Sequence, residues 1–356
     1  MRSIQRLVIG LIKLGFIFAS LAVCFFLILT AVFYLDGMKA AVNISSSCVS
    51  CKKPNISPVM LRMRSRDGFL SGRDWGLDLP SVTTEPELAP ELYLTEHQSI
   101  AAGRANYYRN LAGLEQVTLN NNLNRAAQAH AEYNNRHGLS GHTERSGQAG
   151  FSGVWPWDRM RSFDYRQFTY ATEVCSVRWV SSSYPLSIDP EWAVDSWIDT
   201  VYHRLAILSP NIYEAGFGAS KKGGRVTYVM DFANPGFPIR RQIICYPVNG
   251  QYNVPIEFTG DEIPDPLPGK KYPVGYPVTV TFSGYKNIIV KDIKLFDEQG
   301  DAVKFYKLLP FSDKHIQDTL AVIPKYPLRN RAVYRIIVRA AADGRHINLD
   351  WHFRTR

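Results

Sequence analysis

The sequence lacks the basic stripe with interleaved aromatic residues that is typical of nucleic-acid-binding proteins. Its net charge of +9 over 356 residues is unevenly distributed. The first 60 residues hold six lysines and arginines against one aspartate, which accounts for +5 of the total and leaves +4 for the other 296 residues. Because that remainder is only mildly basic, the sequence predicts no nucleic-acid partner.

Cysteine is scarce, with five residues in the chain. Cys48 and Cys51 form a Cys-x-x-Cys pair, but no second pair accompanies it to build a structural zinc site, and no βαβ pattern indicates a thioredoxin-like site. We expect a small disulfide or free thiols there. Cys175 and Cys245 lie far downstream. Sequence does not give connectivity, so a Cys175–Cys245 disulfide is only one possible pairing.

One long hydrophobic run is present. Residues 14–35 include no charged side chain, and at about 1.5 Å per residue they are long enough to cross a bilayer as a helix. Arg2, Arg6 and Lys13 precede the run, so the positive-inside rule keeps the N-terminus cytoplasmic. We therefore expect an N-terminal transmembrane anchor with the rest of the chain periplasmic or extracellular, where disulfides can persist. The alternative is a cleaved signal peptide and a secreted protein.

Composition divides the chain further. Residues 41–90 are rich in Ser, Pro, Gly and single charges without a sustained period, which is typical of a linker. Regular helix and strand patterns follow, and beyond about residue 238 the helix signals nearly vanish. We expect four parts: a cytoplasmic stub with the transmembrane anchor (1–40), a juxtamembrane linker (41–90), a mixed helix and strand domain (91–238) and a β-sandwich (239–356).

Two helices are predicted early in the mixed domain. A capping box at residues 95–98 opens a helix that runs toward Leu111. Apolar side chains then recur at helical spacing over residues 123–131 and end before Gly138, a residue suited to a helix C-terminus. His130 lies on that apolar stripe, so we expect it in the core or behind a functional site.

Short elements follow. Residues 155–161 favour a short helix, and residues 170–180 a strand that carries Glu173, whose carboxylate needs a partner if it is buried. Residues 215–219 and 226–232 predict a hairpin.

A well-signalled helix lies between these strands. Asp189 is typical of an N-cap and Pro190 of a first helical position, and apolar residues at 194, 197, 198 and 201 make one stripe. His203 follows, where we expect the helix to give way to a loop that leaves the imidazole accessible.

The C-terminal part has strand-like runs at 277–282, 288–296, 334–338 and 347–353, separated by turn residues. They predict an immunoglobulin-like β-sandwich of roughly 100 residues. Because His, Cys and carboxylate residues do not cluster there, we expect a binding or spacer module.

Three polar residues of the mixed domain stand out: His142, Glu173 and His203. Two imidazoles can hold a divalent metal such as zinc, and a nearby carboxylate can orient an imidazole or act as a general base on bound water. Their separation in sequence does not show whether they converge.

Several short motifs, in this order, resemble the CAP superfamily of cysteine-rich secretory, antigen 5 and pathogenesis-related proteins, and its bacterial secreted members in particular. The resemblance covers about residues 91–235. The motifs are Asn106-Tyr107-Tyr108-Arg109-Asn110, Leu123 with Ala126 to Ala131, Gly141-His142, Glu173, and Trp197 with Thr200 and His203-Arg204.

The resemblance implies an α+β fold, a three-layer α-β-α sandwich with an antiparallel sheet and an open cleft. His142 and His203 match the two cleft histidines, which bind zinc in some members, and Glu173 matches the first cleft glutamate. Thr200 stands where animal and plant members have a second glutamate. Bacterial members have an asparagine after the first glutamate, where this chain has Val174. The last segment resembles the β-sandwich that follows the domain in some bacterial proteins.

These features favour a membrane-anchored binding protein for a lipid, glycan or protein ligand of the cell envelope, with or without zinc held by His142 and His203. The alternative is a hydrolase of peptide or cell-envelope material, in which those histidines hold zinc and Glu173 activates water. Two histidines underfill a zinc coordination shell, and no motif supplies an obvious nucleophile or oxyanion hole. A purely structural role for all three residues stays open.

Overall fold

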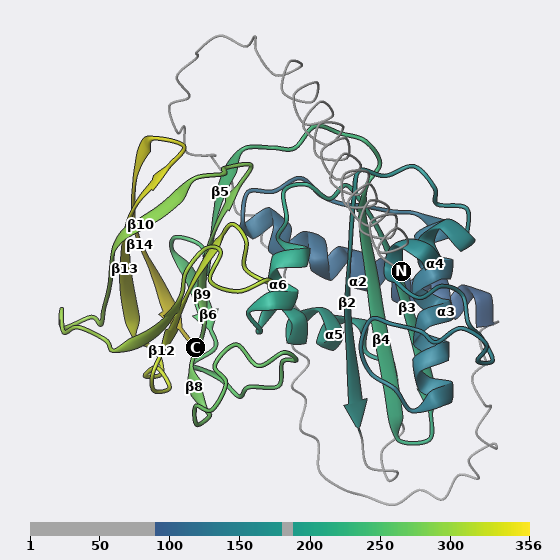
Figure 1. Ribbon diagram of the computed structural model, residues 1–356. Helices are drawn as coiled ribbons and strands as arrows, with labels where there is room; N and C mark the ends of the chain where they lie inside the picture. Colours follow the sequence, from purple (N-terminus) through teal and green to yellow (C-terminus); the bar gives the residue numbers. More distant parts are fainter. Residues whose placement is uncertain (1–89, 180–187) are drawn as a thin grey trace, which may run out of the picture. The chain divides into compact units, whose positions relative to one another are not determined.

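Figure 1 shows the computed structural model, which describes residues 90–179 and 188–356, with side chains from residue 96 onward. All of these residues belong to one compact unit. The predicted anchor at 14–35, the linker and the Cys48–Cys51 pair lie outside the described residues. Among the residues that are described, no helix is both long and apolar enough to span a membrane.

The first half of the described chain is built on a four-stranded sheet with the order β1-β3-β4-β2. The β1–β3 pair is parallel and the other pairs are antiparallel. Every residue of the inner strand β4 is buried. The strands are β1 (Thr118–Leu119), β2 (Tyr170–Trp179), β3 (Glu214–Lys222) and β4 (Arg225–Asn234).

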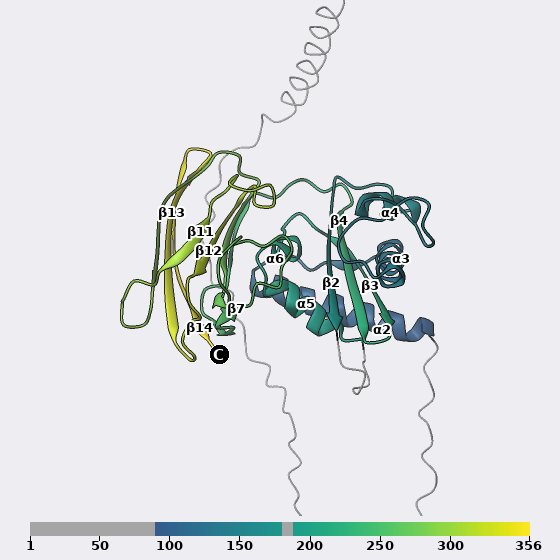
Figure 2. The same cartoon turned by 60° about the horizontal axis from the view of Figure 1, so that its bottom comes forward.

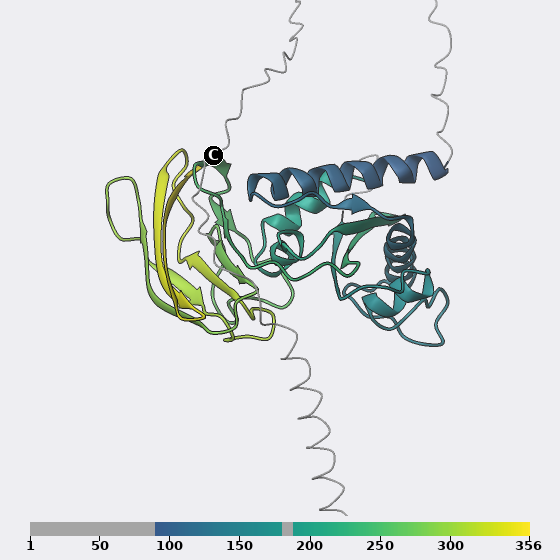
Figure 3. The same cartoon turned by 90° about the horizontal axis from the view of Figure 1, so that it is seen from above.

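Helices cover both faces of this sheet, as Figures 2 and 3 show. Helix α3 packs against β3 and β4 on one face, while α2 contacts β3 and α5 contacts β2 on the other. Close approach of α3 requires glycine on β3, since a Cβ at Gly216 would lie 2.1 Å from the carbonyl carbon of Leu123. The helices are α2 (Pro90–Leu111), α3 (Asn121–His137), α4 (Pro156–Ser162), α5 (Pro190–Ile198) and α6 (Tyr202–Ile207).

Most of the predicted elements of this half are present, including the short α4 and the β3–β4 hairpin. Helix α3 has the expected apolar stripe, fully buried His130 and a left-handed Gly138 at its end. The prediction that α2 begins at residue 95 was wrong. It begins at Pro90, because proline suits the first turn of a helix, so the sequence 95–98 is interior.

The helix expected around residues 189–201 is α5. The Asp189 side chain accepts a hydrogen bond from the Trp192 N–H, and the apolar stripe is buried. The expectation that a loop follows was wrong. The chain turns after Ile198 and enters the short helix α6, so His203 is held in its first turn.

The C-terminal β region, residues 239–356, consists largely of two four-stranded sheets, β10-β13-β14-β6 and β11-β12-β9-β5, so the prediction of a β-rich C-terminal region is confirmed. The strands are β5 (Gln242–Tyr246), β6 (Gln251–Val254), β7 (Glu257–Phe258), β8 (Val274–Gly275), β9 (Val278–Ser283), β10 (Ile288–Phe296), β11 (Phe305–Leu308), β12 (Thr319–Pro324), β13 (Val333–Ala342) and β14 (Arg345–Thr355).

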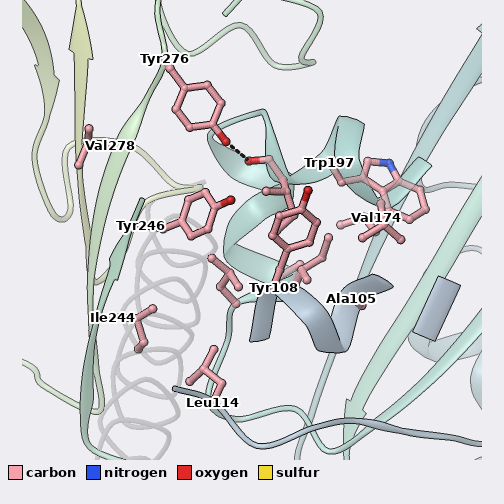
Figure 4. Close-up of a cluster of buried hydrophobic side chains, with 14 of the residues drawn as sticks. Ala105, Tyr108, Leu114, Val174, Trp197, Ile244, Tyr246, Tyr276 and Val278 are labelled. Carbon is pink, nitrogen blue, oxygen red and sulfur yellow. Dashed lines mark hydrogen bonds between the residues drawn. The ribbon is translucent and has the colours of Figure 1, made fainter. Parts of the chain in front are cut away.

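One hydrophobic cluster links this region to the first half. Figure 4 shows part of it, where Tyr108 of α2 and Trp197 of α5 lie in the same cluster as Ile244 and Tyr246 of β5. Burial of such large side chains stabilises the contact through the apolar surface it removes from water. The helices of the first half and the C-terminal β region therefore share a core.

Candidate functional site

His142, Glu173 and His203 all line one cavity of about 480 Å³. The lining also includes residues of the C-terminal β region, such as Thr281 and Gln317. The three residues singled out from the sequence therefore line a common space. The hydrogen-bond partners of each side chain determine what chemistry it can perform.

Glu173 is fixed between two cationic groups. Its side chain is fully buried on β2, with Oε1 2.8 Å from Nδ1 of His142 and Oε2 2.5 Å from Nη2 of Arg159. Burial raises the pKa of Glu173, but Arg159, His142 and His130 together outweigh this and lower it to about 2. Both oxygens are occupied and the carboxylate is weakly basic, so Glu173 is better suited to orient His142 than to take a proton from water.

His142 lies in the loop between α3 and α4, and its side chain is 41% exposed. Burial of part of the ring lowers the pKa of His142, but the adjacent Cys175 sulfur and Glu173 carboxylate raise it to about 11. Arg159 donates a hydrogen bond to the carbonyl oxygen of His142 over 3.1 Å. The loop is thus held at both its backbone and its imidazole.

A second buried layer supports this pair. Nδ1 of His130 lies 2.9 Å from Oε1 of Glu144, whose Oε2 accepts the Ser152 N–H. Burial raises the pKa of Glu144, but its hydrogen bonds with His130 and Ser152 and the charge of Arg159 lower it overall. His130 therefore supports the site from behind, as its place on the apolar stripe predicted.

Asp231 lies directly across from Glu173 in the β2–β4 pairing and is fully buried. Burial and the negative charge of Glu173 raise the pKa of Asp231 well above its usual value. A neutral carboxyl at Asp231 avoids the repulsion that two buried carboxylates would experience.

Cys175 is a free thiol, as is Cys245, so the possible disulfide between them does not form. The reason is placement: Cys175 lies 3.8 Å from Nδ1 of His142, whereas Cys245 is on β5 in the C-terminal β region. His142, Glu173 and Cys175 have possible metal-binding atoms within 4.8 Å of one another, and they are the single such group of three within residues 90–179 and 188–356. His203 does not belong to that group.

His203 is paired with a carboxylate that the sequence did not point to. Its Nδ1 lies 2.9 Å from Oε1 of Glu262, a fully buried side chain in the connection between β7 and β8. Thr200, where a second glutamate was considered, offers only a hydroxyl at 3.2 Å from the same nitrogen. Burial raises the pKa of Glu262, but hydrogen bonds from His203 and nearby backbone N–H groups lower it overall.

Sequence reasoning therefore found the two cleft histidines and Glu173 but missed four supporting groups. Glu144 lies two residues after His142, so an acidic residue close to a candidate histidine was the one local signal that could have identified it. Asp231 was marked only as a polar residue in an apolar strand, and nothing local marked Arg159 or Glu262.

Comparison with known proteins supports the resemblance noted above. Residues 103–232 match the model of the cysteine-rich secretory protein family, CAP. This chain carries a CAP domain. None of the curated proteins matches the chain.

The similar proteins of known structure have low sequence identity to this chain. An outer surface protein from Borrelia burgdorferi is 17% identical, with 40% of this chain and 94% of that chain covered and a TM-score of 0.33. An extracellular SCP-domain protein from Bacillus anthracis is 15% identical, with 42% and 45% covered and a TM-score of 0.33. Venom allergen-like protein 4 of Schistosoma mansoni is 14% identical, with 40% and 90% covered and a TM-score of 0.27.

Proposed function

We propose that this protein is an extracytoplasmic binding protein whose CAP cleft takes up a neutral, hydroxyl-rich ligand of the glycan class. The observation that carries the proposal is the cavity, in which His142 and His203 share one space with polar side chains of the C-terminal β region. Its volume of about 480 Å³ lies within the usual range for small-molecule sites, roughly 300–1,000 Å³.

The lining favours hydroxyl groups over anions. It contains Asp318 but neither lysine nor arginine, the side chains that usually bind phosphate or carboxylate. The charge of His142 is already balanced by Glu173. Tyr170 and Tyr202 add aromatic rings, which have an apolar face and a polar tip. The hydroxyl and amide side chains of the lining, other than the tyrosines, are Thr172, Ser209, Asn211, Thr281, Ser283, Gln317 and Thr319.

The test is calorimetric titration of the purified protein with neutral oligosaccharides, with anionic lipid vesicles and a flexible peptide as competing ligand classes. We expect an oligosaccharide to bind, and His203→Ala to weaken that binding at least tenfold. His346→Ala is the matched control, because this exposed histidine on β14 lies outside the cavity. Binding of vesicles or peptide alone would contradict the ligand class, and an unchanged affinity in His203→Ala would contradict the site.

The location outside the cytoplasm is part of the same proposal. It is supported by the uncharged run at 14–35 and the three cationic residues before it. Protease added to cells whose outer envelope is permeabilised but whose cytoplasmic membrane is intact should digest a tag placed after Arg356. Protection of that tag until the cells are lysed would contradict an extracytoplasmic location.

A second candidate is a metal-assisted hydrolase, and one observation favours it. Both cleft imidazoles have Nδ1 against a buried carboxylate, Glu173 for His142 and Glu262 for His203. Metal-binding histidines commonly show this arrangement, which leaves Nε2 as the ligand atom. This orientation would allow His142 and His203 to contribute Nε2 to a zinc ion whose other ligands come from solvent or substrate, and bound zinc would supply an acidified water as nucleophile. Glu173 and Glu262 would fix the two rings.

Zinc titration separates this candidate from binding alone. The expected result is one stoichiometric site that both His142→Ala and His203→Ala abolish, with folding intact by circular dichroism. The His142 ring, whose pKa is raised to about 11, must lose a proton to bind zinc, so binding should strengthen as the pH rises through and above neutrality. Absence of zinc binding in the parent protein would remove the metal-assisted hydrolase.

A further inference from the structure

The C-terminal β region contacts His203 through a single, fully fixed carboxylate. Besides accepting from Nδ1 of His203 at 2.9 Å, Glu262 accepts three backbone N–H groups. Its Oε2 lies 2.8 Å from the nitrogen of Val201, and its Oε1 lies 2.7 Å from that of Tyr202 and 3.0 Å from that of His203. A carboxylate held by so many donors has one orientation, which places an oxygen at the imidazole.

The residue after His203 fastens the same helix to the C-terminal β region. Arg204 is fully buried and donates from Nη1 to the carbonyl oxygen of Pro277 over 2.7 Å. Its guanidinium also lies over the rings of Tyr246 and Tyr276, at 4.7 and 4.9 Å from their centroids. Figure 4 shows both tyrosines in the buried cluster, Tyr246 from β5 and Tyr276 from just before β9. Helix α6 is therefore fixed to the C-terminal β region at adjacent residues.

The neighbours of Nδ1 also determine where the ring proton lies. The Glu262 carboxylate can only accept at neutral pH. The Thr200 hydroxyl, 3.2 Å from Nδ1, already donates to the carbonyl oxygen of Trp197, so it too can only accept from the ring. Both contacts require a proton on Nδ1, which leaves Nε2 of His203 as the nitrogen available to the cavity.

We propose that Glu262 is a positioning residue of the CAP cleft, which fixes the orientation and Nδ1–H tautomer of His203 from the C-terminal β region. The expectation that this region is a separate binding or spacer module is replaced by one in which it completes the cleft. The charged partner of His203 thus comes from a residue about 60 positions along the chain, whereas Thr200 contributes only an uncharged hydroxyl. The inference concerns the site of the proposed function but does not depend on the ligand class.

The test is nitrogen NMR of the protein labelled with ¹⁵N-histidine, with the His203 signals assigned by their loss in His203→Ala. In the parent, Nδ1 should carry a proton in both the charged and the neutral ring. Glu262→Ala should convert the neutral ring to a mixture of tautomers. Asp261→Asn is the matched control, because Asp261 is the exposed neighbour of Glu262 and should leave the His203 signals unchanged.

Two results would overturn the proposal. A parent His203 with an unprotonated Nδ1 in the neutral ring would do so without any variant, which keeps the test valid if Glu262→Ala fails to fold. An unchanged Nδ1–H tautomer in folded Glu262→Ala would assign the effect to Thr200 instead. Neither measurement requires a ligand, so failure here is distinct from failure to bind oligosaccharide or zinc.

Discussion

Replacing Arg159 with methionine is the sharpest test of the buried network behind the CAP cleft. The guanidinium is fully buried, 2.5 Å from Glu173 and 3.9 Å from Glu144. Methionine preserves much of the side-chain volume, so the main effect is two buried carboxylates left without their cation. Removing one partner of a buried ion pair typically costs about 3–5 kcal/mol, and we expect a loss of that size in the free energy of unfolding at pH 7.

The assay is equilibrium unfolding in urea at pH 7 and pH 4. Without Arg159 the pKa of Glu173 should rise, because Arg159 is the largest influence that lowers it. The carboxylate can then take up a proton at pH 4, so the deficit of Arg159→Met should be smaller there than at pH 7. The double variant Arg159→Met with Glu173→Gln should recover part of the loss, because it removes the unpaired charge.

Arg161→Met serves as the control on the same helix. Arg161 is half exposed and pairs with Asp158 one turn away, so its loss should change stability by no more than about 0.5 kcal/mol. The reasoning fails if Arg159→Met loses less than about 1 kcal/mol at pH 7. It also fails if the deficit is the same at both pH values, because the cost would then not come from unpaired carboxylates.

Three further predictions concern residues that position the site, namely Glu173, Gly216 and Asp189. Because the pKa of Glu173 is lowered to about 2, its contribution to stability is complete above its ordinary pKa of about 4.5 and is lost as the pH falls toward 2. Glu173→Gln should therefore make stability, measured by circular dichroism, fall less steeply between these pH values. An equally steep fall would contradict this. Gly216→Ala should lower the free energy of unfolding in urea by about 1–3 kcal/mol, since its Cβ would meet the backbone of α3. Gly103→Ala, which has open space on α2, should raise that free energy by about 0.5–1 kcal/mol. Equal effects of the two substitutions would be inconsistent with close packing at Gly216. Asp189→Ala should lose about 1 kcal/mol of stability with the loss of its cap to Trp192, and a thermal melt that matches the parent would show that the cap contributes nothing.

Local signals predicted the elements that hold the site. The α3 stripe, the Asp189 cap and the β3–β4 hairpin each depend on residues a few positions apart, so spacing and turn chemistry were sufficient. The same reasoning failed where two local signals competed. A capping box was read as a helix start, but a proline five residues earlier fits that position better. A histidine beyond an apolar stripe was assigned to a loop, although the chain begins a second short helix there.

The supporting charges could not be predicted because they depend on tertiary contacts. Arg159 is in α4 and Glu173 in β2, and no periodic pattern relates them. Asp231 appeared only as a polar residue in an apolar strand, and its partner depends on the register of β4 against β2. Glu262 lies in a connection between two short strands, without a neighbouring motif. Its role follows from the packing of the C-terminal β region on α6, which no sequence pattern specifies.

The different sources of the two carboxylates also have a thermodynamic consequence. Glu173 and its imidazole both belong to the CAP domain, whereas the carboxylate behind His203 comes from the C-terminal β region. A ligand that contacts both the CAP-domain residues and the C-terminal residues of the cavity would therefore bind only while the CAP domain and the C-terminal β region are packed together. At 100 times its dissociation constant such a ligand stabilises the bound state by about 2.7 kcal/mol. That stabilisation should appear as protection from hydrogen exchange in both α6 and the β7–β8 connection. Protection confined to the CAP domain would indicate that the ligand contacts only the CAP-domain residues of the cavity.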